Sequence, residues 1–196
     1  MKSPKRNEIS AISCTPLDPT RAFTRTIVVS YWSSNTIEVF SVTESGFKSI
    51  YLSPSLPSLV TSLLLYNFGS DQSSKGLDYH PYLLAGLSDG SVAIFSWQEQ
   101  QLKDRKIISL GHAPVSLIVY TAALGSNGNG SVGSREGGSD VKTVLAIGNR
   151  AIVFSHERNR LVHSPILLKV RYHTFQAHNL HLNIDDCNRI LLPHHQ

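Results

Sequence analysis

One short pattern occurs three times along this sequence, and each occurrence has the residue order of a β-hairpin. The clearest copy is Pro81–Trp97, where an apolar run is followed by the turn residues Ser88–Gly90 and then by a second run rich in β-forming residues. Gly90 can adopt the positive φ that a tight turn needs. Residues 26–40 and 144–154 repeat this order of strand, polar turn and strand. The pattern predicts three antiparallel hairpins.

The hairpins recur at a nearly constant interval. Phe40, Phe95 and Phe154 close the equivalent second strands, and their residue numbers differ by 55 and 59. A β-rich unit that recurs at such a period is typical of a β-propeller. With a first and a fourth strand around each hairpin, the sequence predicts an all-β fold of about three consecutive four-stranded blades that form an incomplete ring. The expected blades are residues 8–52, 59–110 and 115–168.

The ends of the second and third units are marked by turn residues. We expect Gln98–Lys103 to turn the chain and Arg105–Leu110 to form the fourth strand of the second unit. His112 then lies in the turn that begins the link to the next unit. In the third unit, Leu161–Leu168 is the expected fourth strand, and Pro165 favours an edge position or an early end.

Three segments fall outside the repeat. Residues 1–7 form a basic leader, which is interpreted as a solvated start, with a nuclear localisation signal as the alternative. Residues 125–140 are rich in Gly and Ser and predict a flexible insertion between the first two strands of the third blade. Residues 170–196 contain five histidines but no fourth blade, and we expect a divergent, weakly ordered tail.

Composition excludes several classes of protein. The chain has 196 residues and a formal net charge of +4, and its Lys and Arg residues are scattered, so charge alone does not indicate a nucleic-acid-binding surface. Cys14 and Cys187 lie far apart, which is typical of a reducing compartment and not of a disulfide framework. No apolar run approaches the roughly 20 residues of a membrane span, so we expect no membrane partner.

Motifs that could support catalysis or ligand binding are weak. Gly128–Gly133 matches G-x-G-x-x-G, but without a preceding strand or a following helix it is interpreted as a linker. The tail histidines, among them His173 and His178, and Cys187 lack the short paired spacings of a zinc site. No serine lies in a G-x-S-x-G nucleophile motif. We therefore expect no enzymatic activity, no cofactor, no metal site and no small-molecule substrate.

Several strings of residues, in order along the chain, resemble one known family. They are Tyr82–Gly90, Leu102–Lys106 and Ser109–Gly111, with extensions at Glu8–Leu17, Val29–Trp32 and Gly148–Lys169. Together they cover roughly residues 8–169. The family contains DNA damage-binding protein 1 and the large subunits of cleavage/polyadenylation and splicing factors.

The resemblance implies several seven-bladed propellers in a much longer chain, of which these residues are about three blades of the second propeller. It also implies a function as an adaptor of ubiquitin ligases in DNA repair, in which the second propeller docks a cullin scaffold. The implied partners are a cullin, further propellers of the same protein and, indirectly, DNA. The implied location is the nucleus, with the cytoplasm as the alternative. Because the pattern ends after Lys169, we expect a fragment or a truncated gene model.

Two residues fall where the family keeps an acidic residue and a tryptophan used in cullin docking. Glu8 begins the first strand, and Trp32 ends a strand just before a polar turn. The resemblance assigns both residues to a cullin-docking surface. The alternative interpretation is that Trp32 packs between blades while Glu8 is an ordinary solvated charge.

The sequence leaves two classes of function open. The first is a non-enzymatic adaptor that presents a protein-docking surface. The second is a nucleic-acid-binding module of an RNA-processing or splicing-factor propeller protein. Nucleic-acid binding requires a clustered basic face and weakens steeply with salt, whereas protein docking requires an exposed aromatic or apolar patch.

Overall fold

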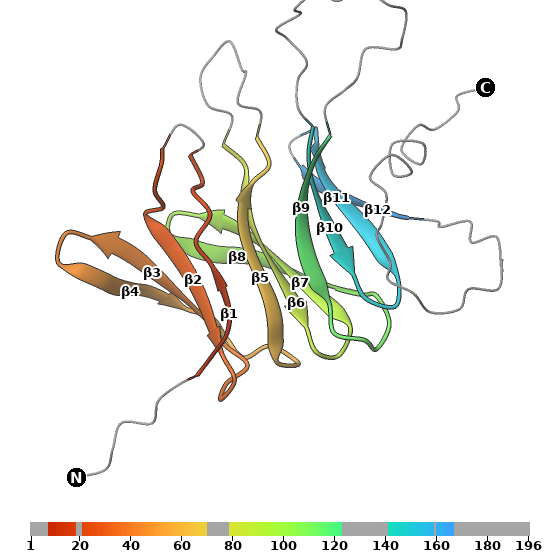
Figure 1. Ribbon diagram of the computed structural model, residues 1–196, viewed down its shortest axis with the longest axis horizontal. Coiled ribbons are helices and arrows are strands. Elements are labelled where there is room, and N and C mark those ends of the chain that lie inside the picture. The colour runs from red at the N-terminus through yellow and green to blue at the C-terminus, as the bar shows by residue number, and fades with distance from the viewer. Residues whose placement is uncertain (1–7, 19–20, 70–78, 123–140, 159, 167–196) are drawn as a thin grey trace, which may run out of the picture. The chain divides into compact units, whose positions relative to one another are not determined.

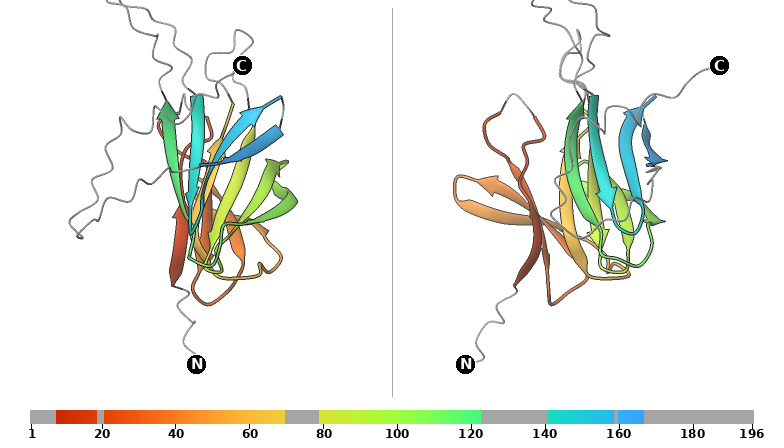
Figure 2. Two further views of the ribbon diagram at one scale, coloured as in Figure 1. Left: turned by 90° about the vertical axis from the view of Figure 1, so that its right-hand side faces the viewer. Right: turned by 45° about the vertical axis from the view of Figure 1, so that its right-hand side comes forward.

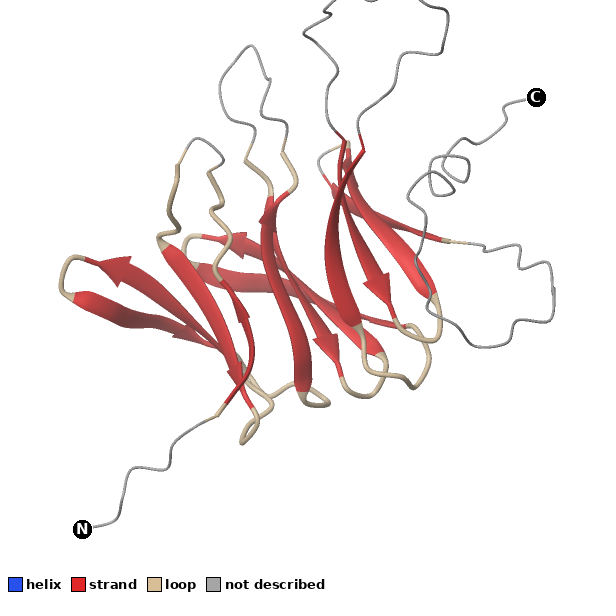
Figure 3. Ribbon diagram, in the orientation of Figure 1, coloured by secondary structure: helices blue, strands red, loops and turns tan. Residues whose placement is uncertain are grey.

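The computed structural model describes residues 8–18, 21–69, 79–122, 141–158 and 160–166. Over these residues the chain contains strands, turns and loops but no helix (Figure 3). All of the strands belong to the first of two compact units, which spans residues 1–165. The expected leader, insertion and tail lie outside the described residues.

The described strands form three four-stranded sheets, each an antiparallel meander in chain order (Figures 1 and 2). The first sheet contains β1 (Ile9–Ser13), β2 (Thr26–Tyr31), β3 (Ile37–Thr43) and β4 (Gly46–Leu52). The second contains β5 (Val60–Asn67), β6 (Pro81–Leu87), β7 (Ser91–Gln98) and β8 (Gln101–Ser109). The third contains β9 (Ser116–Ala122), β10 (Val141–Ile147), β11 (Ala151–Glu157) and β12 (Arg160–Pro165). The predicted all-β fold of three incomplete-ring blades is confirmed.

The turn between β6 and β7 shows why the central hairpin forms. The Asp89 carboxylate accepts hydrogen bonds from the Ser91 backbone N–H at 3.0 Å and from the Ser91 hydroxyl at 2.6 Å. Gly90 has a φ of +85°, and a side chain there would meet the Gly111 carbonyl oxygen at 2.4 Å. The turn therefore requires glycine for both its backbone conformation and its packing.

The turn between β7 and β8 is shorter than the predicted Gln98–Lys103 segment. Only Glu99 and Gln100 turn the chain, and β8 begins at Gln101 instead of Arg105. Both turn residues have the positive φ that a type I′ turn requires, 51° and 61°. The sequence indicated a turn here but not its tight two-residue form, because such positions usually carry Asn or Gly. A bulge at Asp104, where φ is 55°, lets β8 keep pairing beyond the turn.

The core lies in two apolar layers, one on each side of the second sheet. Inward side chains of the first sheet meet one face of the second sheet in the first layer. Its buried members are Val28, Ile37, Val39, Leu56, Val60, Leu63, Leu65, Leu83, Ala85, Leu87, Ala93, Phe95, Trp97 and Leu102. The third sheet meets the opposite face in the second layer. Its buried members are Leu64, Phe68, Leu84, Val92, Ile94, Leu110, Val115, Val144, Ala146, Ile152 and Phe154.

Hydrogen bonds between serine hydroxyls and backbone groups also join neighbouring sheets. The Leu65 backbone N–H in β5 donates to the Ser13 hydroxyl of β1 at 2.9 Å. In the link to the third sheet, the Val115 carbonyl accepts from the Ser62 hydroxyl at 2.8 Å, and a side chain on Gly86 would meet that carbonyl at 2.4 Å. The spacing between sheets is therefore fixed by backbone contact as well as by apolar side chains.

The link between the second and third sheets begins at His112, as predicted. His112 lies in a bend, where it is exposed. Its backbone N–H donates to the Asn149 side-chain oxygen at 2.7 Å, and the Ala113 N–H donates to the same oxygen at 2.6 Å. The β10–β11 turn thus holds the preceding link in place. His112 contributes a backbone group to this contact, which agrees with its interpretation as a turn residue.

Gly86 provides the first test of this packing. We expect Gly86→Ala to lower the free energy of unfolding by about 1–3 kcal/mol, because the added methyl group would overlap a backbone carbonyl that has little room to move. Gly148→Ala is the matched control, since its methyl group would lie 3.3 Å from the Ala113 carbonyl. Urea denaturation measures both. Equal midpoints for the two variants would contradict the close approach at Gly86.

The outer faces of the first and third sheets are also apolar, and no described element covers them. On the first sheet, Phe47 is 71% exposed and Ile12 is 53% exposed. They belong to a shallow hollow lined by Ile9, Ile12, Ile27, Val29, Tyr31, Phe40 and Phe47. On the third sheet, Ile118 and Ile147 are exposed on the face away from the second sheet.

We expect residues 1–196, expressed alone, to self-associate through these two outer faces. Burying exposed apolar side chains is favourable, and in a propeller such faces are covered by neighbouring blades. Sedimentation velocity should show association that grows with concentration and decreases in Ile12→Lys. Ile107→Lys, on an exposed position of the second sheet, is the control. A monodisperse monomer with a sharp, cooperative melt would contradict this expectation.

Candidate protein-docking site

Glu8 and Trp32 lie side by side at one edge of the first sheet. Glu8 directly precedes β1 and Trp32 directly follows β2, and these antiparallel strands pair Ile9 with Tyr31. The Trp32 backbone N–H donates to the Glu8 carbonyl oxygen at 2.9 Å. We use the name turn edge for the end of the sheets at which β2, β6 and β10 finish. The opposite end of the sheets, at which these strands begin, is called the loop edge (Figure 1).

The two tryptophans of the chain have opposite environments. Trp32 is 56% exposed, whereas Trp97 is 7% exposed within the first apolar layer. The Trp32 indole is therefore not packed between the first and second sheets. Glu8 is also exposed, and its carboxylate forms no ion pair with any other described residue. The Trp32 ring and the Glu8 carboxylate are thus attached to neighbouring backbone positions on two adjacent strands.

The turn that follows Trp32 is held by hydrogen bonds. The Ser34 backbone N–H donates to the Tyr31 carbonyl at 3.3 Å, and the hydroxyls of Ser34 and Thr36 are 2.9 Å apart. The Leu56 N–H, in the link to the second sheet, donates to the Asn35 carbonyl at 2.7 Å. These contacts fix the backbone on which Trp32 is presented, so little conformational entropy remains to be lost on binding.

A second carboxylate, that of Glu38 on β3, is already occupied. The Tyr31 hydroxyl donates to one Glu38 oxygen at 3.0 Å, and the Ser49 hydroxyl donates to the other at 2.6 Å. Burial raises the pKa of Tyr31, and the hydrogen bond to Glu38 and its negative charge raise it further. Glu38 therefore serves to hold β2, β3 and β4 together, while Glu8 remains available to a partner.

Other predicted features are less informative. The G-x-G-x-x-G match, Cys187 and the tail histidines lie outside the described residues. Within the described part of the chain, no group of three His, Cys, Asp or Glu side chains is arranged to hold a metal ion. The described residues also include no helix long and apolar enough to cross a membrane.

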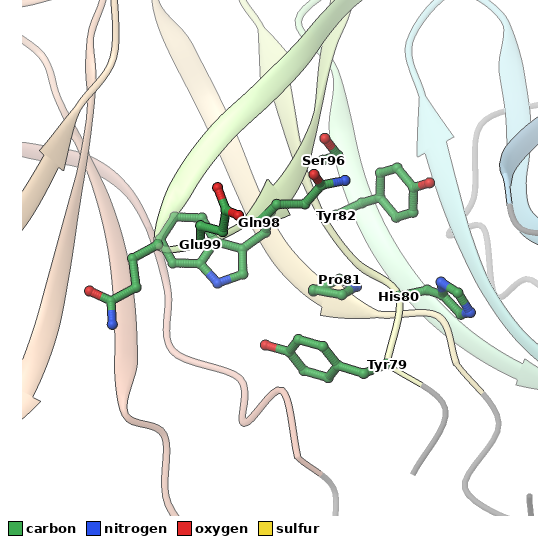
Figure 4. Close-up of a pocket in the computed structure, with 9 residues that line it drawn as sticks. Tyr79, His80, Pro81, Tyr82, Ser96, Gln98 and Glu99 are labelled. Carbon is green, nitrogen blue, oxygen red and sulfur yellow. The ribbon is translucent and has the colours of Figure 1, made fainter.

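Sequence reasoning missed a second surface, at the loop edge. A cavity of about 450 Å³ contains Tyr79, Tyr82, Trp97 and Gln98 in its lining (Figure 4). A neighbouring cavity of about 250 Å³ contains Phe23 and Arg25 and shares Tyr79. We call the two together the Tyr79 groove. No sequence signal marks it, because its residues come from three separate segments.

Three meander sheets that share two apolar layers define the class of this protein: it is a segment of a β-propeller. A family model described as the RSE1/DDB1/CPSF1 second beta-propeller matches residues 2–181, and the chain belongs to this family. The match includes the blades and extends past Lys169. A comparison with curated proteins found no match.

The environments of the two tryptophans can be checked in solution. We expect Trp97→Phe, which retains Trp32, to emit at long wavelength and to be quenched readily by iodide. Trp32→Phe, which retains Trp97, should emit at shorter wavelength and resist quenching, because its indole is shielded from water. Similar quenching of both variants, each still folded by circular dichroism, would contradict the exposed position of Trp32.

Proposed function

We propose that this chain is a non-enzymatic adaptor segment that docks a cullin scaffold through Glu8 and Trp32 at the turn edge. Family membership supports a propeller scaffold, and the resemblance to the damage-binding branch supports a cullin partner, a ubiquitin-ligase complex in the nucleus and an indirect association with DNA during repair. The single observation that supports this docking surface is the exposure of the Trp32 indole, on a hydrogen-bonded turn beside a free carboxylate.

The physical argument rests on what these side chains gain on contact. A tryptophan buries a large apolar area when a partner covers it, and Trp is enriched among the residues that dominate binding energy. A carboxylate beside it favours a partner surface with a complementary basic group and helps to set orientation. Because the turn is already ordered, most of this interaction energy remains available for binding.

We expect Trp32→Ala to weaken cullin binding by about 2 kcal/mol, which is roughly 30-fold in Kd. Glu8→Ala should have a smaller effect, and the double variant should show whether the two residues act on one contact. The measurement is calorimetric titration of the full chain, residues 1–196, with a cullin.

Phe23→Ala is the matched control, because Phe23 is an equally exposed aromatic residue near the opposite end of β2. Unchanged affinity in all three turn-edge variants, with folding preserved, would remove Glu8 and Trp32 from the docking surface. A loss of the same size in the Phe23 variant would show that the effect is not specific to the turn edge.

The alternative is a nucleic-acid-binding module, and two pairs of opposite charge in the described part of the chain weigh against it. Lys103 pairs with Glu99 at 2.6 Å, and Arg21 pairs with Asp18 at 3.0 Å. These contacts reduce the positive charge offered to phosphates. Binding of an oligonucleotide that falls steeply with salt would favour the alternative.

A further inference from the structure

The Tyr79 groove lies at the far end of the strands from the cullin-docking surface. Phe23 and Arg25 precede β2, whereas Trp32 follows it, so the two surfaces occupy opposite edges of the first sheet. Tyr79 comes just before β6, and Gln98 ends β7, so the groove joins the first and second sheets. A ligand in this groove would not compete with a partner at the turn edge.

The larger cavity is suited to a bulky apolar side chain. Its volume, about 450 Å³, falls within the roughly 300–1,000 Å³ of typical ligand pockets. Tyr79, which is 49% exposed, lies on one side of Pro81, and the Gln98 amide lies on the other side (Figure 4). Aromatic surface with a few amide donors and acceptors can hold an apolar group and the peptide backbone next to it.

The smaller cavity contributes one available positive charge. Arg21 is paired with Asp18, but the Arg25 guanidinium forms no ion pair with any described residue. At the other end of the groove, Glu99 is held by Lys103. Burial and the negative charge of Asp18 raise the pKa of Tyr79, so its hydroxyl stays protonated and can donate a hydrogen bond.

We infer that the Tyr79 groove binds an extended peptide of a partner protein in which an acidic residue lies close to a bulky apolar residue. The apolar side chain would enter the larger cavity beside Tyr79, and the carboxylate would pair with Arg25. One available guanidinium matches the single carboxylate of such a peptide, whereas a nucleic-acid strand requires positive charge along the whole groove. This function is additional to cullin docking.

The test uses the full chain, residues 1–196, and two fluorescein-labelled peptides, Gly-Asp-Gly-Phe-Gly and Gly-Lys-Gly-Phe-Gly. Fluorescence anisotropy should show a preference of roughly tenfold for the acidic peptide. Arg25→Glu should invert the preference, because the carboxylate then attracts the lysine peptide and repels the acidic one. Tyr79→Ala should weaken both peptides, since it removes part of the apolar surface. Inversion of preference is a readout that a merely structural role of Arg25 would not produce.

Trp32→Ala is the matched control and should leave both peptide affinities unchanged, while Arg25→Glu should leave cullin binding unchanged. The two variants therefore distinguish a failure of the cullin-docking proposal from a failure of the peptide-binding proposal. If Arg25→Glu does not fold, Arg25→Gln should abolish the preference without inverting it. An unchanged preference in the folded variant would overturn the inference. Tighter binding of an oligouridylate probe than of either peptide, lost in Arg25→Glu, would overturn it in favour of nucleic acid.

Discussion

The second sheet has two apolar faces, and both must be covered. Every residue of β7 except the last is buried, so the strand has no side that could face water. The first sheet covers one face and the third sheet covers the other, and each contact forms its own apolar layer. A sheet of this kind cannot be stable alone, and the order of the three sheets in the structure follows from this requirement.

Most of the fold could be predicted because strands and turns leave local signals. Alternating and apolar runs of β-forming residues mark strands, and Ser88–Gly90 marks a turn that only glycine can complete. The turn within Gln98–Lys103 was predicted, but its two-residue length at Glu99 and Gln100 was not, because residues that rarely adopt a positive φ do so there. Tertiary pairing of β7 with β8 outweighs that local preference.

The sites were predictable to different degrees. The resemblance selected Glu8 and Trp32, but the hydrogen bond that joins them depends on the pairing of β1 with β2, which includes a bulge between Ile9 and Ala11. A bulge shifts every later residue pair between the two strands by one position, and no residue pattern predicts it. The Tyr79 groove could not be predicted at all, because its walls come together only when two sheets pack.

The hydrogen bond from Leu65 to Ser13 has a consequence for synthesis of the chain. Every strand pair joins neighbours in sequence, so each sheet can form soon after it leaves the ribosome. The inner apolar side chains of the first sheet pack against the second sheet, which follows in the chain and reaches Ser13 through Leu65 of β5. We therefore expect the described blades to be added in chain order during synthesis, because each sheet can form before its partner in the shared apolar layer has been made.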